Sequence, residues 1–78
     1  MRQVQIRLRS VQDVLDFVAL ATARPFPIQV ANNGHQVNGK SFMEMFCLNL
    51  LQPMKVTFQC TEEEYALFCW DAARFMVQ

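Results

Sequence analysis

Residues 37–43 read Val37-Asn38-Gly39-Lys40-Ser41-Phe42-Met43 and mark the passage from a short strand to a short helix. The strand is expected over roughly His35 to Asn38, and Gly39 interrupts it. Ser41 is followed three residues later by Glu44, which is the serine-x-x-acid pattern of a capped helix start. The pattern therefore predicts a short helix from Phe42 to about Leu50.

The flanking sequence alternates apolar and polar residues in three further places, which is typical of strands with one buried face. Asn32-Asn33-Gly34 precedes the strand at His35 and predicts a tight hairpin, because asparagine and glycine accept positive φ angles. The apolar members of the three alternating runs are Val4, Ile6 and Leu8, then Phe26, Ile28 and Val30, and after Pro53 also Met54, Val56, Phe58 and Cys60.

Two longer helices are expected after hydroxyl-bearing cap residues. The first follows Ser10 and should stop before Arg24-Pro25, because the residue before a proline disfavours helical geometry. The last follows Thr61, which forms a capping box with Glu64, and should run from Glu62 nearly to the C-terminus. The apolar residues of the first helix recur at helical spacing and are Val11, Val14, Leu15, Val18 and Ala21.

The resulting order of elements is strand, helix, strand, strand, helix, strand, helix. Four half-buried strands need one apolar cover, and three amphipathic helices can supply it. We therefore expect an α+β fold in which a four-stranded antiparallel sheet carries three helices on one face. Residues 1–78 are expected to form a single domain.

Composition narrows the classes of partner. Seven basic and seven acidic residues cancel, and without a basic cluster we expect no nucleic acid as a partner. The longest apolar run is too short to span a bilayer, and the polar, alternating N-terminus is neither a signal nor a transit peptide. We therefore expect a cytosolic protein that does not act on membranes.

The chain contains three cysteines, Cys47, Cys60 and Cys69, and a single histidine, His35. An odd number of cysteines without paired spacing argues against a disulfide framework. No CxxC pair occurs and His35 is not grouped with the cysteines, so no metal site is expected. We expect buried, inert thiols, a solvated His35 after the hairpin, and no cofactor.

Residues 37–43, with weaker support from Ile28-Gln29 and Asn33-Gly34, resemble the centre of HPr. HPr is the histidine-containing phosphocarrier of the bacterial sugar phosphotransferase system. The order and spacing of the expected strands and helices resemble those of HPr over essentially the whole chain. It implies an open-faced β-sandwich in which the helix after the first strand begins at the active site.

The resemblance places Ser10 where HPr carries its phosphorylated histidine. The next positions read Val11, Gln12 and Asp13, where the family has alanine, arginine and proline. Imidazole is nucleophilic near pH 7, whereas a hydroxyl needs an adjacent base. We therefore expect no catalytic residue and no histidyl phosphotransfer, with Ser10 acting as a helix cap. The alternatives are a phosphocarrier that uses Ser10 and a residual anion site at this helix start.

Ser41 matches the serine that a dedicated kinase phosphorylates in HPr of many Gram-positive bacteria, so it is a candidate for regulatory phosphorylation. A capping role alone is the other interpretation. In HPr the residues that correspond to Phe42, Met43 and Phe46 form an apolar patch that docks on enzyme I and other partners, and Lys40 would flank it. The alternative is that one or two of them fill the core.

The last helix is apolar all round from Tyr65 to Trp70. One helix face cannot bury that much apolar surface in a monomer. Leu67 and Trp70 point away from Tyr65 and Phe68, which predicts contact with a partner or a homo-oligomer with no phosphate role; close packing on the sheet is the alternative. As the leading hypothesis, the chain is an HPr-family regulatory or docking module rather than an enzyme. Its expected partner is a transcription regulator or another phosphotransferase-system component.

Overall fold

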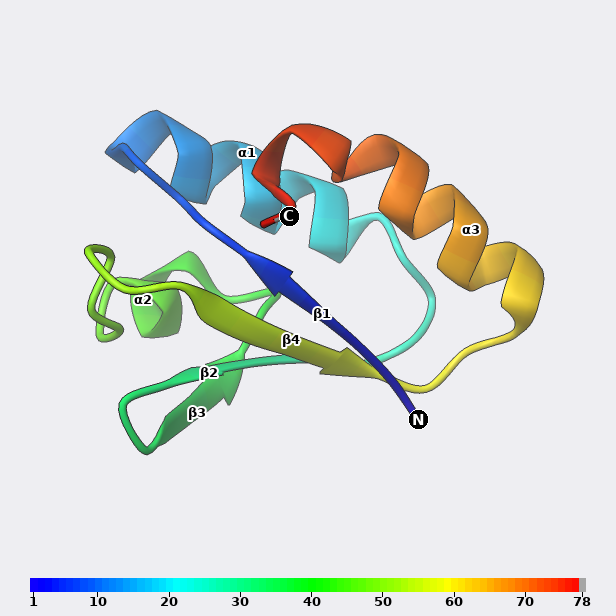
Figure 1. The fold of residues 1–78 in the computed structure, drawn as a ribbon, viewed down its shortest axis with the longest axis horizontal. Coiled ribbons are helices and arrows are strands. Elements are labelled where there is room, and N and C mark those ends of the chain that lie inside the picture. Colours follow the sequence, from blue (N-terminus) through cyan, green and yellow to red (C-terminus); the bar gives the residue numbers. More distant parts are fainter. Residues whose placement is uncertain (78) are drawn as a thin grey trace.

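The computed structural model describes residues 1–77, and the seven expected elements follow one another in the predicted order (Figure 1). A short 3₁₀ helix, η1, comes after the last α-helix. The elements are β1 (Arg2–Ile6), α1 (Val11–Thr22), β2 (Ile28–Asn32), β3 (His35–Asn38), α2 (Phe42–Met45), β4 (Met54–Phe58), α3 (Glu62–Asp71) and η1 (Ala73–Phe75).

The four strands form one antiparallel sheet in the order β1-β4-β2-β3. In the register of this sheet, Val56 on β4 lies opposite Val4 on one side and Val30 on the other. All three valines are buried. The next residue along, Thr57, lies between Gln3 and Gln29 on the opposite face. The period of two thus gives the sheet one apolar face and one polar face.

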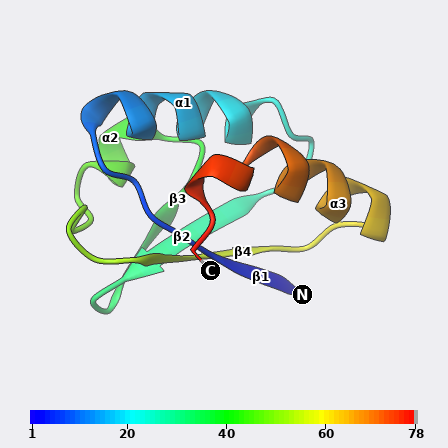
Figure 2. The same ribbon diagram turned by 45° about the horizontal axis from the view of Figure 1, so that its top comes forward.

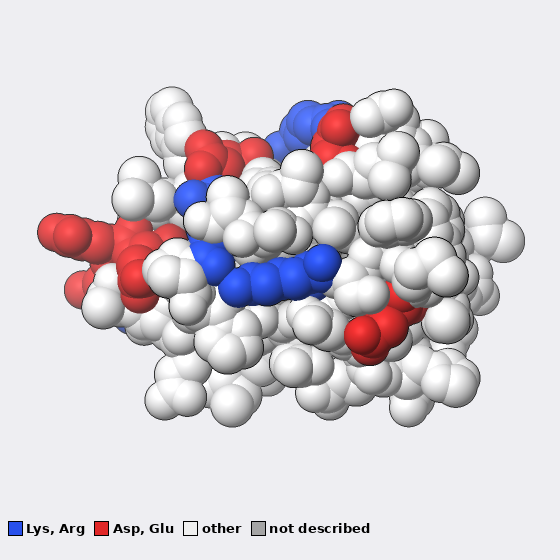
Figure 3. Space-filling view, turned by 180° about the vertical axis from the view of Figure 1, so that it is seen from behind, with Lys and Arg blue, Asp and Glu red and all other residues white. Residues whose placement is uncertain are grey.

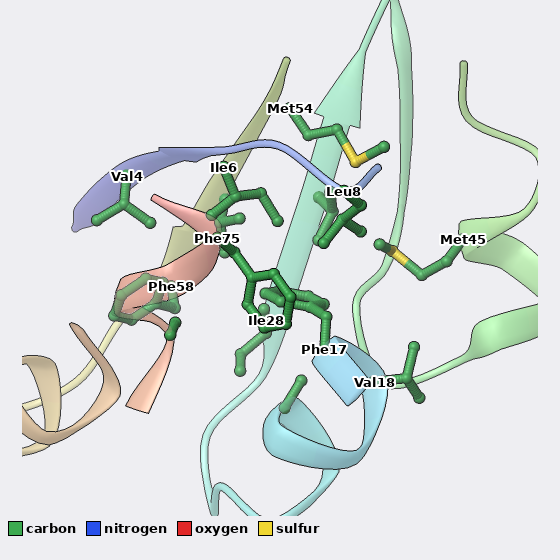
Figure 4. Close-up of a cluster of buried hydrophobic side chains, with 14 of the residues drawn as sticks. Val4, Ile6, Leu8, Phe17, Val18, Ile28, Met45, Met54, Phe58 and Phe75 are labelled. Atoms are coloured by element: carbon green, nitrogen blue, oxygen red, sulfur yellow. The ribbon is translucent and has the colours of Figure 1, made fainter. Parts of the chain in front are cut away.

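The helices lie together on the apolar face and leave the polar face uncovered (Figure 2). Phe17 of α1 packs edge to face with Phe68 of α3 and Phe75 of η1, at ring-centroid distances of 6.3 and 6.0 Å. Ile28 of the sheet lies beside Phe17 and Phe75 (Figure 4), and the ring centroid of Phe58 is 4.7 Å from that of Phe68. This arrangement confirms the expected α+β open-faced sandwich. Among the described helices, none is long and apolar enough to cross a bilayer.

The hairpin between β2 and β3 has the predicted geometry. Asn33 and Gly34 adopt positive φ angles of 48° and 81°, as a two-residue turn requires. β2 begins at Ile28 rather than at Phe26, because Pro27 offers no N–H to a strand partner. Phe26 is nevertheless buried and stacks on Phe58. At this same end of the sheet, Cys60 lies beyond the end of β4.

The prediction for the middle helix was too long, because α2 ends at Met45 rather than near Leu50. After Met45 the backbone tightens into 3₁₀-type bonds, in which the N–H of Cys47 donates to Glu44 O and that of Leu48 donates to Met45 O. This turn brings Leu48 into the core beside Met45. The need to bury Leu48 thus ends the helix.

The prediction for the last helix was also too long, because α3 stops at Asp71. The chain then turns through η1, buries Phe75 and lies along the outer edge of β1. Met76 forms a bridge with Ile6, while Arg7 N–H donates to Phe75 O and Val77 N–H donates to Gln5 O. The end of the described chain therefore protects part of the edge of β1 from pairing with other chains.

Candidate functional site

The start of α1 is where the resemblance places a phosphorylated histidine, and here it is a self-contained helix cap. Ser10 has extended backbone geometry, and its Oγ accepts the N–H of Asp13 at 3.1 Å. This is the ordinary bond of an N-cap serine. The Ser10 hydroxyl is exposed, and no base is bonded to it among the described side chains.

Asp13 supplies the negative charge that a helix start attracts. Its Oδ2 accepts the backbone N–H of Arg9 at 3.0 Å, and its Oδ1 accepts from Arg74 at 3.3 Å. Arg74 also donates to Asp16 at 2.6 Å. A carboxylate of the chain itself therefore occupies the electropositive end of α1, and it is tied to a cation from the C-terminal segment.

Ser41 caps α2 in the same way, with its Oγ accepting the N–H of Glu44 at 3.4 Å. Glu44 does not complete the predicted capping box, because its carboxylate accepts the N–H of Asn38 at 3.2 Å instead of that of Ser41. The N–H of Ser41 donates to Asn38 O. Ser41 is half-buried, so its side chain combines a structural bond with partial access to solvent.

Phe42, Met43 and Phe46 all lie at the surface, where they are 46%, 72% and 40% exposed. The rings of Phe42 and Phe46 pack edge to face at 6.1 Å. Met45, between them in sequence, is fully buried and fills the core. We call Phe42, Met43 and Phe46 the α2 patch.

Lys40 does not extend freely beside the α2 patch. Its Nζ donates to the backbone carbonyl of Arg24 at 2.7 Å, at the end of α1. Arg24 in turn pairs with Asp71 of α3. Figure 3 shows basic side chains crossing the middle of one face, with acidic side chains at its left edge, along its top and at its lower right. Lys40 thus ties the start of α2 to the end of α1, where a cation also suits the helix dipole.

Val11 and Leu15 belong to the apolar stripe expected on α1, but they lie at the surface rather than in the core. They lie one turn apart on α1 and are 59% and 40% exposed. α1 contacts α2, and these two side chains add exposed apolar surface to α1. The signal was present in the sequence, because apolar residues spaced by four share a helix face. The same spacing also predicts the core-facing stripe that contains Val14 and Val18, so the exposed face could not be told from it.

The remaining residues singled out from the sequence lie elsewhere. His35 is exposed at the start of β3, opposite Asn32. All three cysteines are free, but the expectation that they are buried was wrong for Cys47, which is exposed; Cys60 and Cys69 are half-buried. Cys47 follows the short α2, at a position where the chain turns before Leu48 enters the core.

Comparison with protein-family models gives no match, and comparison with curated proteins gives none either. Among solved structures, HPr-C-His from Thermoanaerobacter tengcongensis matches with a TM-score of 0.76 and 24% identity, over 95% of this chain and 92% of that one. A phosphocarrier protein HPr from Bacillus anthracis str. Ames matches with a TM-score of 0.62 and 22% identity, over 90% of this chain and 92% of that one. At these identities the likeness shows the architecture: the chain has the fold of HPr phosphocarrier proteins.

Proposed function

We propose that the chain is an HPr-family protein that serves as a regulatory or docking module and does not act as a histidyl phosphocarrier. The fold and residues 37–43 support the family. The observation that carries the functional part is a contrast between two helix starts. At the start of α1, Ser10 and Asp13 accept backbone N–H groups of the chain itself. At the start of α2, by contrast, the α2 patch is left exposed.

Chemistry at Ser10 argues against the alternative of a serine phosphocarrier. A serine hydroxyl becomes a good nucleophile when an adjacent base removes its proton. Ser10 Oγ instead accepts a hydrogen bond from the N–H of Asp13. An incoming phosphoryl group would also meet the Asp13 carboxylate, which repels it. A serine phosphate, being an ordinary ester, would in addition be a poor phosphoryl donor.

The α2 patch supports docking on a protein partner. Methionine and phenylalanine are enriched in the cores of protein interfaces because they offer large, adaptable apolar area. The partner we propose is a component of the phosphotransferase system such as enzyme I, or a transcription regulator that reads the state of that system. Both belong to the cytosol.

Ser41 is the proposed point of regulation. It lies directly before Phe42 and Met43, so a phosphate there would place about two negative charges at the border of the α2 patch. The Glu44 carboxylate, held by the N–H of Asn38, lies on the same first turn. Phosphorylation of Ser41 would therefore change which partners the patch accepts.

Titration calorimetry tests the docking proposal, with enzyme I and a phosphotransferase-linked transcription regulator as the two partners. We expect one of them to bind the wild-type chain, and Met43→Asp to weaken that binding at least about tenfold, as loss of an interface anchor does. Trp70→Asp, which alters a similarly exposed apolar residue on another helix, is the matched control. Absence of binding to both partners, or an equal effect of both substitutions, would contradict the proposal.

Incubation with an HPr serine kinase and ATP tests the regulatory part. We expect one acid-stable phosphate on the wild-type chain and on Ser10→Ala, and none on Ser41→Ala, as read by mass spectrometry. A wild-type chain that stays unmodified while a genuine HPr is phosphorylated in the same tube would remove Ser41 from the account.

A further inference from the structure

Helix α3 has a second apolar face that the fold does not use. Its inward face carries Phe68 and Ala72, both fully buried. On the outward face, Leu67 is 61% exposed and Trp70 is 81% exposed. These two residues are three positions apart and therefore neighbours on the helix surface. Small exposed residues, Ala66 and Ala73, lie on either side of them.

Charge along α3 is uneven. The first turn holds Glu62, Glu63 and Glu64. Glu64 is used in the capping box with Thr61, whereas Glu62 and Glu63 are exposed. At the other end of the helix, Asp71 is paired with Arg24. The helix therefore has an acidic end, an apolar middle and an end whose carboxylate is already neutralised.

Just beyond α3, Arg74 also has its charge matched within the chain. It pairs with Asp13 and Asp16 of α1. Among residues 1–77, no strong charge of either sign is thus left unpaired at this end of α3. An approaching acidic helix end therefore meets neither strong attraction nor the repulsion of a second glutamate cluster.

We propose that two copies of this chain associate through the outward faces of α3, with the two helices antiparallel about a two-fold axis near Leu67 and Trp70. An isologous contact requires a surface that is complementary to itself. In the antiparallel arrangement, the apolar middle of each helix meets that of the other. Each glutamate cluster then lies beside the neutralised end of the other helix.

A parallel arrangement is much less favourable. It would place the two glutamate clusters side by side, with three carboxylates from each copy. Antiparallel α3 helices separate the clusters by roughly the helix length, about 15 Å for ten residues at about 1.5 Å each. That separation exceeds the Debye length of about 8 Å at physiological ionic strength, so the repulsion is screened.

The size of the surface sets the strength of the dimer. A buried aromatic side chain contributes roughly 150–250 Å², and a specific interface needs about 1,000 Å² in total. Two tryptophans supply roughly 300–500 Å², and the leucines and small alanines leave the total below about 1,000 Å². We therefore expect a reversible dimer that forms at tens to hundreds of micromolar. It is independent of the α2 patch and of the proposed function.

Sedimentation equilibrium over about 5 µM to 1 mM tests the proposal. We expect the wild-type mass to rise towards that of a dimer and Trp70→Glu to remain monomeric, which corresponds to at least about tenfold weaker association. Met43→Glu, which alters an exposed apolar residue on α2, should dimerise like the wild type. Circular dichroism should show Trp70→Glu folded, because Trp70 makes little contact with the core.

Two results would overturn the α3 contact: a wild-type chain that stays monomeric throughout the range, or a Trp70→Glu chain that dimerises as the wild type does. The orientation has its own test in Glu63→Cys, made together with Cys47→Ser to remove the exposed native thiol. Antiparallel helices keep the two new thiols apart, so we expect no cross-linked dimer under mild oxidation. Rapid formation of a disulfide-linked dimer would contradict the antiparallel arrangement.

Discussion

At the scale of single residues, Gly39 shows how tightly the strand-to-helix segment is fitted. A Cβ at this position would lie 2.9 Å from Ile28 Cγ2, 3.1 Å from Val30 Cγ2 and 3.3 Å from Ile28 O. Because two of these neighbours are core side chains and the third is backbone, they have little room to move. The glycine is thus required by close packing rather than by an unusual φ angle.

We predict that Gly39→Ala lowers the free energy of unfolding by about 1–3 kcal/mol, the usual cost of overpacking. Urea denaturation measures the change. Gly34 provides the control for a glycine that is required by its backbone angle, because it has space for a Cβ but a φ of 81°. Gly34→Asn, which tolerates that angle, should cost less than Gly34→Ala. Equal stability of Gly39→Ala and the wild type would show that β2 can yield to the added methyl group.

Ser10 gives the second residue-scale prediction. If it is only a helix cap, Ser10→Ala should lower the free energy of unfolding by about 1 kcal/mol and leave partner binding through the α2 patch unchanged. Paired denaturation and calorimetry experiments check this. A variant of unchanged stability that loses a partner or a phosphate would instead assign Ser10 a direct functional role.

At the scale of elements, local sequence patterns predict the structure correctly wherever a residue interacts with its near neighbours in sequence. The caps at Ser10 and Ser41 and the turn at Asn33-Gly34 form as predicted. At Ser41 the serine half of the predicted capping box forms, because Ser41 Oγ accepts the N–H of Glu44. The Glu44 carboxylate, however, accepts the N–H of Asn38 in the preceding strand. That choice depends on where β3 lies relative to α2, which no local pattern contains.

Other features could not be predicted from the sequence because they depend on contacts between distant parts of the chain. Arg74 reaches Asp13 and Asp16 across about sixty positions, and Lys40 reaches the carbonyl of Arg24 at the end of α1. The early ends of α2 and α3 have the same origin, because burial of Leu48 and Phe75 turns the chain out of the helix. Helical periodicity alone continues past both points.

The C-terminal segment offers a comparison between charge and apolar burial. Arg74 is 57% exposed at its side chain, and surface ion pairs contribute at most about 1 kcal/mol. Phe75 is buried against Phe17, and removing such a ring costs about 3–5 kcal/mol. We predict that Phe75→Ala destabilises the chain far more than Arg74→Ala.

Salt screens ion pairs, so the loss of stability caused by Arg74→Ala should become smaller at high salt, whereas that caused by Phe75→Ala should not. Chemical denaturation at low and high salt checks both parts. If Arg74→Ala proved the more damaging substitution, the ion pairs rather than the ring would hold the segment against α1.

At the scale of the whole molecule, the half-buried thiol of Cys60 links stability to pH. Burial, with the nearby Glu64 carboxylate adding to it, raises the pKa of Cys60 above its ordinary value of 9.0. The folded chain therefore holds this proton at a pH where the unfolded chain has lost it. The resulting stability is fully present below about pH 9 and is lost as the pH rises further.

We predict that the urea midpoint falls between pH 8 and pH 10, and that Cys60→Ala reduces this fall. Some of the fall should persist, because the side chain of Cys69 likewise raises the pKa of Tyr65. Cys47→Ala, which removes an exposed thiol, serves as the control for loss of a cysteine. An unchanged slope in Cys60→Ala would show that this thiol is not the group that titrates.

The whole molecule combines the fold of a phosphocarrier with a helix start that holds no imidazole. Incubation with enzyme I and radiolabelled phosphoenolpyruvate, with a histidine-bearing HPr in a parallel tube, tests this most directly. We predict that the HPr acquires acid-labile label and that this chain acquires none. Acid-stable label on this chain that is lost in Ser10→Ala, or acid-labile label that is lost in His35→Ala, would show that the chain does accept the phosphoryl group of enzyme I.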